Sequence, residues 1–169
     1  EQSFAYANAR IARAWGERPL TQTILRTHLA QLRAIDLPAV LEMFHPSRRD
    51  TCFVALVHLD ERQAVIAAGD RSDETLPVQQ IDELWTREAA LSWPEDDALA
   101  ADEGRLAEWA RPRLAAQGYR ASDLTTAVRR YQSDARLVSD GLLGPRTRMT
   151  LFARDPGPRP RLSARKGTP

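Results

Sequence analysis

Residues 94–104 form an acidic stretch that divides the chain into two parts with different hydrophobic patterns. The stretch holds five acidic side chains, and Leu99 is its only bulky apolar residue. Before it, short apolar runs of strand length alternate with helical spacing, whereas after it the apolar residues recur only at helical spacing. An acidic, apolar-poor stretch between two such segments is typical of a linker. The sequence therefore predicts an α+β domain over 1–94, an acidic linker over 95–104, a small all-α domain over 105–154 and a Pro/Arg-rich tail, extended or disordered, over 155–169.

The charge of the chain is divided at nearly the same place. Residues 1–103 carry 10 basic and 18 acidic side chains, whereas residues 104–169 carry 14 basic and 5 acidic ones. A basic second half is attracted to polyanions such as nucleic acid, anionic lipid or a carboxylate-bearing cell-wall polymer. All basic residues except Lys166 are Arg, which suits an anionic ligand, although a GC-rich genome also explains this usage. We expect no nucleic-acid partner, because the sequence contains no recognition-helix or base-stacking pattern.

The first domain combines helical and strand patterns. Apolar spacing predicts helices over 4–15 and 21–33, and Gly16 is positioned to end the first of them. Apolar runs over 39–44 and 52–59 predict strands, and residues 63–68 are expected to pair with 52–59 as a hairpin. The remaining elements expected in this domain are a strand over 76–78, a helix over 79–85 and a strand over 89–93.

The residue types that carry chemistry are sparse. The single cysteine, Cys52, excludes an internal disulfide framework and a multi-Cys zinc site, and its apolar strand favours a core role. His28, His45 and His58 fall on different elements without a close pair, so we expect no metal site and no cofactor. No apolar run approaches the ~20 residues of a membrane-spanning helix. Because the chain begins at Glu1 without Met, we expect it to be a fragment or processed product of a longer protein.

The second domain carries a specific motif. Residues 127–132 read Ala-Val-Arg-Arg-Tyr-Gln, and residues 137–147 read Leu-Val-Ser-Asp-Gly-Leu-Leu-Gly-Pro-Arg-Thr. Together with Leu151, this resembles the small three-helix peptidoglycan-binding domain. Its pattern is Ala-Val, two residues, aromatic-Gln, then Leu, two residues, Asp-Gly, two residues, Gly-Pro, one residue, Thr. The resemblance implies an all-α fold that binds peptidoglycan.

A peptidoglycan ligand presents carboxylates, amides and hydroxyls, so its binding site needs cations and hydrogen-bonding side chains. Arg146 lies beside the turn at 140–144, where its guanidinium and backbone N–H groups are placed to hold a carboxylate, and Thr147 adds a hydroxyl. Structural roles stay open: solvated surface charges for the arginines, core packing for Tyr131, a turn-stabilising hydrogen bond for Gln132 and capping for Asp140. The candidate peptidoglycan-binding residues are Arg129, Tyr131, Gln132, Asp140, Arg146 and Thr147.

The first domain resembles the papain-like domain of bacteriocin-processing peptidases. The resemblance consists of a helix ending in Trp15-Gly16, the run Leu37 to Leu41, two hairpin strands, Trp85 and Trp93. Asp70 matches the orienting acid of that family, but Cys52 stands where the family has its His, and residues 1–51 contain no Cys. A thiolate–imidazole pair is impossible without a nucleophile in place. The resemblance therefore implies a degenerate cysteine-peptidase-like lobe with a small antiparallel sheet and no enzyme activity.

A degenerate peptidase-like domain, a peptidoglycan-binding domain and the ending Pro160-Arg161-Leu162 together resemble the periplasmic region of general secretion pathway protein A. That resemblance implies a non-catalytic periplasmic module that helps to assemble or position the outer-membrane secretin of type II secretion. It also implies an inner-membrane-anchored parent with an ATPase outside this chain, secretion-system partners and a possible homo-oligomer. The alternative is a cell-wall hydrolase or cysteine peptidase that is targeted by its wall-binding domain.

Overall fold

The computed structural model describes residues 1–70 and 72–164, which fold into two compact units. Unit 1 comprises Glu1–Pro94 together with the residues from Pro158 onward, and unit 2 comprises Glu95–Gly157. The described residues contain a six-stranded sheet and seven helices, so the α+β class is confirmed.

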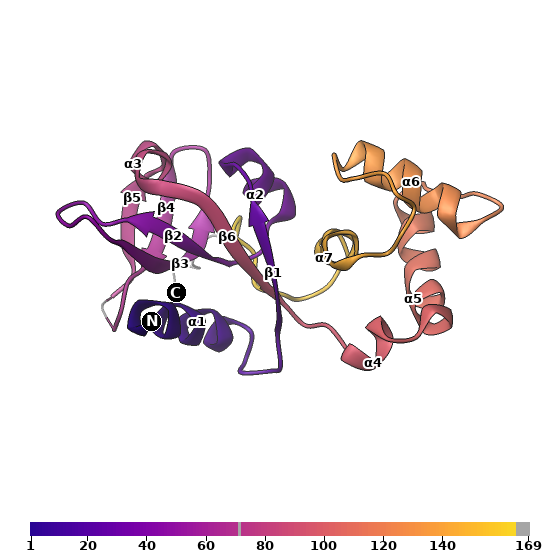
Figure 1. The fold of residues 1–169 in the computed structure, drawn as a ribbon, viewed down its shortest axis with the longest axis horizontal. Coiled ribbons are helices and arrows are strands. Elements are labelled where there is room, and N and C mark those ends of the chain that lie inside the picture. Colours follow the sequence, from indigo (N-terminus) through magenta and orange to yellow (C-terminus); the bar gives the residue numbers. More distant parts are fainter. Residues whose placement is uncertain (71, 165–169) are drawn as a thin grey trace. The chain divides into compact units, whose positions relative to one another are not determined.

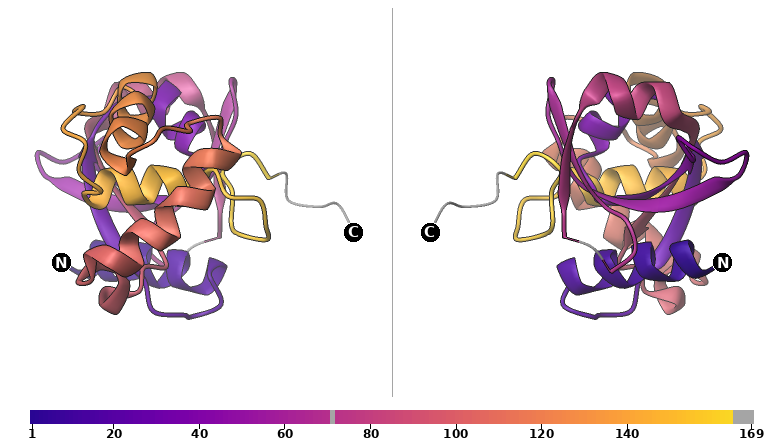
Figure 2. Two further views of the ribbon diagram at one scale, coloured as in Figure 1. Left: turned by 90° about the vertical axis from the view of Figure 1, so that its right-hand side faces the viewer. Right: turned by 90° about the vertical axis from the view of Figure 1, so that its left-hand side faces the viewer.

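Unit 1 is built around an antiparallel sheet with the strand order β1-β6-β2-β3-β4-β5. Helix α1 packs against β3 and β2, and Figures 1 and 2 show α2 and α3 on the other side of the strands. Leu41, Leu56 and Leu91, on three neighbouring strands, are fully buried and form part of the core. The elements of unit 1 are α1 (Gln2–Ala14), β1 (Thr21–Arg26), α2 (Leu29–Ile35), β2 (Ala39–Phe44), β3 (Thr51–Leu59), β4 (Gln63–Ala67), β5 (Glu74–Pro77), α3 (Val78–Leu84) and β6 (Trp85–Trp93).

The prediction of a helix over residues 21–33 is wrong for the first half of that range. Residues Thr21–Arg26 form edge strand β1, in which Thr23 and Leu25 are buried while their neighbours are more exposed. β-branched residues in alternation favour a strand, and pairing with β6 buries one face of it. The helix is confined to α2, where the His28 ring accepts a hydrogen bond from the N–H of Gln31 at 3.3 Å.

The hairpin predicted over 52–59 and 63–68 is confirmed as β3 and β4, with one irregularity that the sequence did not indicate. Leu56 pairs with Ile66 and His58 pairs with Val65, so Val57 is an extra residue in β3. Such a β-bulge redirects side chains and lets neighbouring residues of one strand face the same side. This bulge positions Val57 and His58 on one wall of a cavity described below.

Unit 2 consists of helices α4 (Asp97–Ala100), α5 (Glu103–Ala116), α6 (Leu124–Asp134) and α7 (Pro145–Ala153). The stretch predicted to be a linker is therefore partly helical. Two of its acidic residues cap helices, because Asp96 accepts from the N–H of Ala98 at 2.9 Å and Asp102 from that of Arg105 at 3.0 Å. Pro112 lies inside α5.

The predicted tail returns to unit 1 instead of remaining apart from any core. We call residues 158–164 the strap. Within it, Leu162 is fully buried, and its carbonyl accepts a hydrogen bond from the N–H of Leu59 at 3.0 Å. The N–H and hydroxyl of Ser163 donate to the carboxylate of Asp36 at 2.7 and 2.9 Å. A single leucine among Pro and Arg has no periodicity, so the sequence did not indicate this contact; residues 165–169 of the predicted tail lie outside the described residues.

Candidate functional site

Of the six candidate residues, Tyr131 belongs to the hydrophobic core of unit 2. Tyr131 is fully buried on α6 beside Val128, and its ring packs edge-on against that of Tyr119 with the centroids 5.4 Å apart. Burial raises the pKa of the Tyr131 hydroxyl. The guanidinium of Arg154 lies over the ring, 5.3 Å from its centroid. These contacts direct the Tyr131 ring into the unit, where it supports the fold and does not face a surface ligand.

Gln132 joins α6 to the following loop and to α7 through hydrogen bonds from both ends of its amide. The two hydrogens of its Nε2 are shared among three acceptors: Oδ1 of Asp140 and the carbonyl of Leu142, both at 2.9 Å, and Oγ1 of Thr147 at 3.1 Å. Its Oε1 accepts from the N–H of Gly141 at 2.8 Å. Gln132 and Thr147 are 1% and 4% exposed, so the bond between them is shielded from competing water. The amide of Gln132 therefore fixes the position of the loop over 138–144.

The turn at Asp140 and Gly141 is determined by its local geometry. Oδ1 of Asp140 also accepts from the N–H of Leu142 at 2.9 Å, and this bond, followed by that from Gln132, lowers the pKa of the carboxyl. Gly141 has φ +77°, and a Cβ there would lie 2.7 Å from Cγ2 of Thr125. Positive φ and this close approach both favour glycine.

A polar surface with two exposed aliphatic side chains lies around this turn. Val138 and Leu142 are 78% and 67% exposed, and the side chains of Arg129, Asp140 and Arg146 are exposed as well. We call these five residues the loop surface. The positive charge of Arg129 contributes to the lowered pKa of Asp140, so the two side chains interact electrostatically. Val138 and Leu142, which stand on either side of the Ser-Asp-Gly turn, were not among the candidate residues predicted from the sequence.

The structure separates the six candidates into an exposed and a buried set. Gln132, Asp140 and Thr147 are joined by hydrogen bonds, and Arg129 accepts a hydrogen bond at its carbonyl from the Ser139 hydroxyl at 2.9 Å. The exposed set is Arg129, Asp140 and Arg146, and the buried set is Tyr131, Gln132 and Thr147. Only the exposed set is placed for direct contact with a ligand at the surface.

Arg148 secures the far end of the same loop. It forms an ion pair with Glu95, and the two side chains are only 12% and 6% exposed. Arg148 also donates to the carbonyl of Leu143 at 2.6 Å. A buried ion pair with an additional hydrogen bond gives Arg148 a structural role and ties the loop to the first residue of unit 2.

The single cysteine of the sequence lies in unit 1. Cys52 lies on β3 opposite Met43, and burial raises the pKa of its thiol. A catalytic cysteine needs a lowered pKa, because the thiolate is the reactive form. Within residues 1–70 and 72–164, no three His, Cys, Asp or Glu side chains are grouped so as to hold a metal ion. None of the helices in that part of the chain combines the length and apolar character needed to span a membrane.

Comparisons with known proteins give a similarity to solved structures only. No protein-family model matches the chain, and a search of the curated proteins finds no match. Among solved structures, the chain is similar to the crystal structure of a periplasmic domain of the EpsAB fusion protein of the Vibrio vulnificus type II secretion system. The sequence identity is 19% and the TM-score is 0.48, and the similarity covers 83% of this chain and 67% of that chain. A similarity of this size does not assign the chain to a family.

Proposed function

We propose that the chain is a non-catalytic peptidoglycan-binding module of the periplasm that helps to assemble or position the secretin of type II secretion. The observation that carries the proposal is the hydrogen bonding of Gln132. It gives a structural reason for the Gln, Asp-Gly and Thr markers of the peptidoglycan-binding motif, since all of them take part in one bonded cluster. We therefore assign α5, α6 and α7 to a three-helix peptidoglycan-binding domain.

The loop surface has the chemistry that a peptidoglycan ligand requires. The guanidinium groups of Arg129 and Arg146 are exposed and suited to the carboxylates of the wall peptides. Val138 and Leu142 offer apolar contact to the methyl groups of the same peptides. Because Gln132 fixes the loop, binding would require little ordering of the protein, which favours affinity.

Unit 1 is proposed to be a degenerate papain-like lobe without peptidase activity. The raised pKa of the Cys52 thiol supports this interpretation, as does the absence of another cysteine in the sequence. The alternative, a cell-wall hydrolase or cysteine peptidase, predicts muropeptide release or thiol-dependent proteolysis by the purified chain. We expect neither activity.

The wider context of the proposal comes from the sequence resemblance to the periplasmic region of general secretion pathway protein A. It includes a membrane-anchored parent, secretin and other secretion-system partners, and a possible homo-oligomer. Each of these is testable separately from wall binding, for example by co-purification with secretin subunits.

Co-sedimentation with purified sacculi tests the central proposal. We expect the full chain to pellet with sacculi at low salt and the double variant Arg129→Gln/Arg146→Gln to pellet at least about 10-fold less, since each loses a charge-assisted contact worth about 1.5–3 kcal/mol. The matched control is Arg111→Gln/Arg120→Gln, which removes the same charge from exposed positions of unit 2 outside the loop surface. Equal losses in both double variants would indicate nonspecific charge attraction, and no pelleting of the unaltered chain would refute wall binding.

A further inference from the structure

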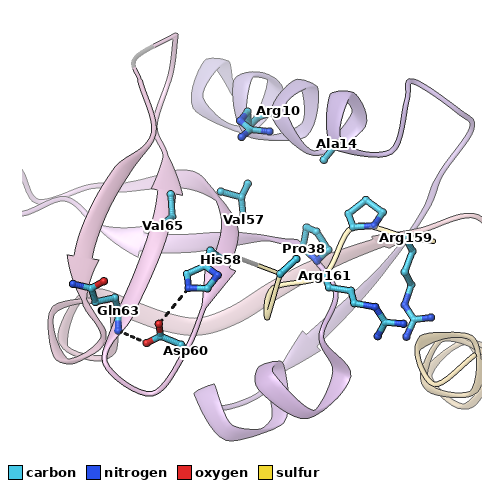
Figure 3. A pocket seen from close by; sticks show the side chains of 12 residues that line it. Arg10, Ala14, Pro38, Val57, His58, Asp60, Gln63, Val65, Arg159 and Arg161 are labelled. Atoms are coloured by element: carbon cyan, nitrogen blue, oxygen red, sulfur yellow. Dashed lines mark hydrogen bonds and ion pairs between the residues drawn. The ribbon is translucent and has the colours of Figure 1, made fainter. Parts of the chain in front are cut away.

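Unit 1 contains a cavity of about 560 Å³ that the proposed function does not use. Figure 3 shows its walls: helix α1 on one side, strands β3 and β4 behind, and the strap on the remaining side. Ligand sites commonly have volumes of about 300–1,000 Å³, so this cavity has room for a few residues of a peptide.

The apolar part of the lining, which we call the floor, is made of small side chains. Ala14 from α1, Val57 and Val65 from the hairpin, and Pro38 and Pro160 contribute to it. The bulge in β3 brings Val57 to the same wall as its neighbour His58. The described lining residues include no Phe, Tyr or Trp, so the cavity offers no ring for stacking and suits short aliphatic groups.

Three arginines line the same cavity, and two of them are positioned by carboxylates outside it. Arg10 donates from Nε and Nη2 to Asp73 at 3.2 and 3.0 Å. Arg161 lies 3.5 Å from Asp36. A guanidinium has five N–H donors, so each pair holds its arginine in place and uses only part of its hydrogen-bonding capacity. Arg159 also lines the cavity.

The carboxylate of Asp60, which also lines the cavity, already accepts hydrogen bonds from the protein. Oδ1 of Asp60 accepts from the N–H groups of Arg62 and Gln63, both at 2.7 Å, and Oδ2 lies 3.3 Å from Nε2 of His58. The two backbone N–H bonds are the main reason why the pKa of Asp60 is lowered to about 2. Figure 3 shows the Asp60 carboxylate turned toward Gln63 and His58. The Asp60 carboxylate is therefore held within the turn between β3 and β4.

The strap illustrates how unit 1 holds an extended segment. Leu162 supplies a buried apolar anchor and one backbone hydrogen bond to Leu59, while Ser163 is held by Asp36. The cavity lies beside this segment and shares three strap residues, Arg159, Pro160 and Arg161, in its wall.

We propose that this cavity binds a short peptide of small aliphatic residues that ends in a free carboxylate, with the side chains on the apolar floor and the carboxylate at Arg10. This inference does not depend on the function proposed above. The same chemistry is offered by a protein C-terminus, made of L residues, and by a cell-wall stem peptide, which contains D residues.

Fluorescence anisotropy with the full chain tests the proposal. The probes are N-terminally labelled Gly-Ala-Ala peptides in three forms: L residues with a free carboxylate, D-Ala residues with a free carboxylate, and L residues with an amidated end. We expect saturable binding of at least one carboxylate form, at least about 10-fold tighter than that of the amide, because a charge-assisted bond is lost. The preferred stereoisomer identifies the source of the ligand. No saturable binding, or equal binding of acid and amide, overturns the proposal.

Two matched pairs of variants locate the binding. Ala14→Phe fills the cavity from an exposed helix position, whereas Ala9→Phe makes the same change at an exposed position of α1 outside the lining. We expect at least a 10-fold loss for A14F and less than a two-fold change for A9F. Arg10→Gln should remove the preference for the carboxylate, whereas Asp73→Asn breaks the same ion pair, leaves the arginine charge and should keep the preference. Binding that is insensitive to both A14F and R10Q excludes this cavity as the site.

Discussion

Replacing Gln132 by leucine tests whether this residue holds the loop or contacts a ligand. The change keeps the side-chain size and removes the bonds of Nε2, whose two hydrogens serve three acceptors, together with the bond accepted by Oε1. Two donated hydrogens and one accepted hydrogen, at about 1 kcal/mol each, give an upper value of about 3 kcal/mol. Asp140 is exposed, and water replaces its lost partner. Thr147 is buried and keeps an unpaired hydroxyl, so we expect a net loss of about 2–3 kcal/mol in the stability of unit 2.

Hydrogen exchange of the full chain, measured by mass spectrometry, reports this loss of stability separately for individual segments of the chain. A loss of about 2–3 kcal/mol corresponds to roughly 30- to 150-fold faster exchange of the most protected amides in α6 and α7, with no change in the strands of unit 1. The control is Gln117→Leu, which removes one hydrogen bond of 3.3 Å from Arg154 and should change exchange less than about 3-fold. Unchanged exchange in Gln132→Leu combined with weaker sacculus binding would refute the structural role and restore Gln132 as a ligand contact.

Three further predictions concern single residues. Gly141→Ala should destabilise unit 2 by at least about 1 kcal/mol, because alanine is strained at φ +77° and its Cβ meets Thr125; an unchanged thermal midpoint contradicts this. Leu162→Ala should destabilise unit 1 by about 2–4 kcal/mol, measured by urea unfolding, because it shortens a fully buried side chain. An unchanged free energy of unfolding would show that Leu162 does not pack against unit 1. The pKa of Asp140 is lowered in the folded chain, so its contribution is present above the ordinary Asp pKa and is lost as pH falls through the folded value. Asp140→Asn should therefore flatten the acid side of the stability profile, and a profile identical to that of the unaltered chain would rule this out.

The sequence was informative where the pattern is local and misleading where two elements share one periodicity. The β3–β4 hairpin follows from apolar runs on either side of a short polar turn. Ile24, Leu25 and Leu29 fit one helical face, yet the first two belong to β1 and the third to α2, because pairing with β6 outweighs the helical spacing. The contact of Leu162 with unit 1 joins residues about a hundred positions apart, and no local pattern encodes it.

The sequence named the candidate residues but did not indicate which of their side chains are buried. The motif named Gln132, Asp140 and Thr147, but only three-dimensional packing shows that Gln132 and Thr147 point inward. The turn-stabilising role that the sequence left open for Gln132 matches its hydrogen bonds. The exposure of Val138 and Leu142 depends on the path of the loop, which the sequence does not specify.

Unit 2 is inserted within unit 1, since the chain leaves at Pro94 and returns at Pro158. Unit 2 is therefore joined to unit 1 by two segments that are held to different degrees. One is β6, which is paired on both sides by β1 and β2. The other is the strap, in which Leu162 is bonded to Leu59 and Ser163 to the carboxylate of Asp36. Because the strap has fewer bonds than β6 and forms one wall of the cavity, we expect its local unfolding to open that wall while β6 stays paired in the sheet.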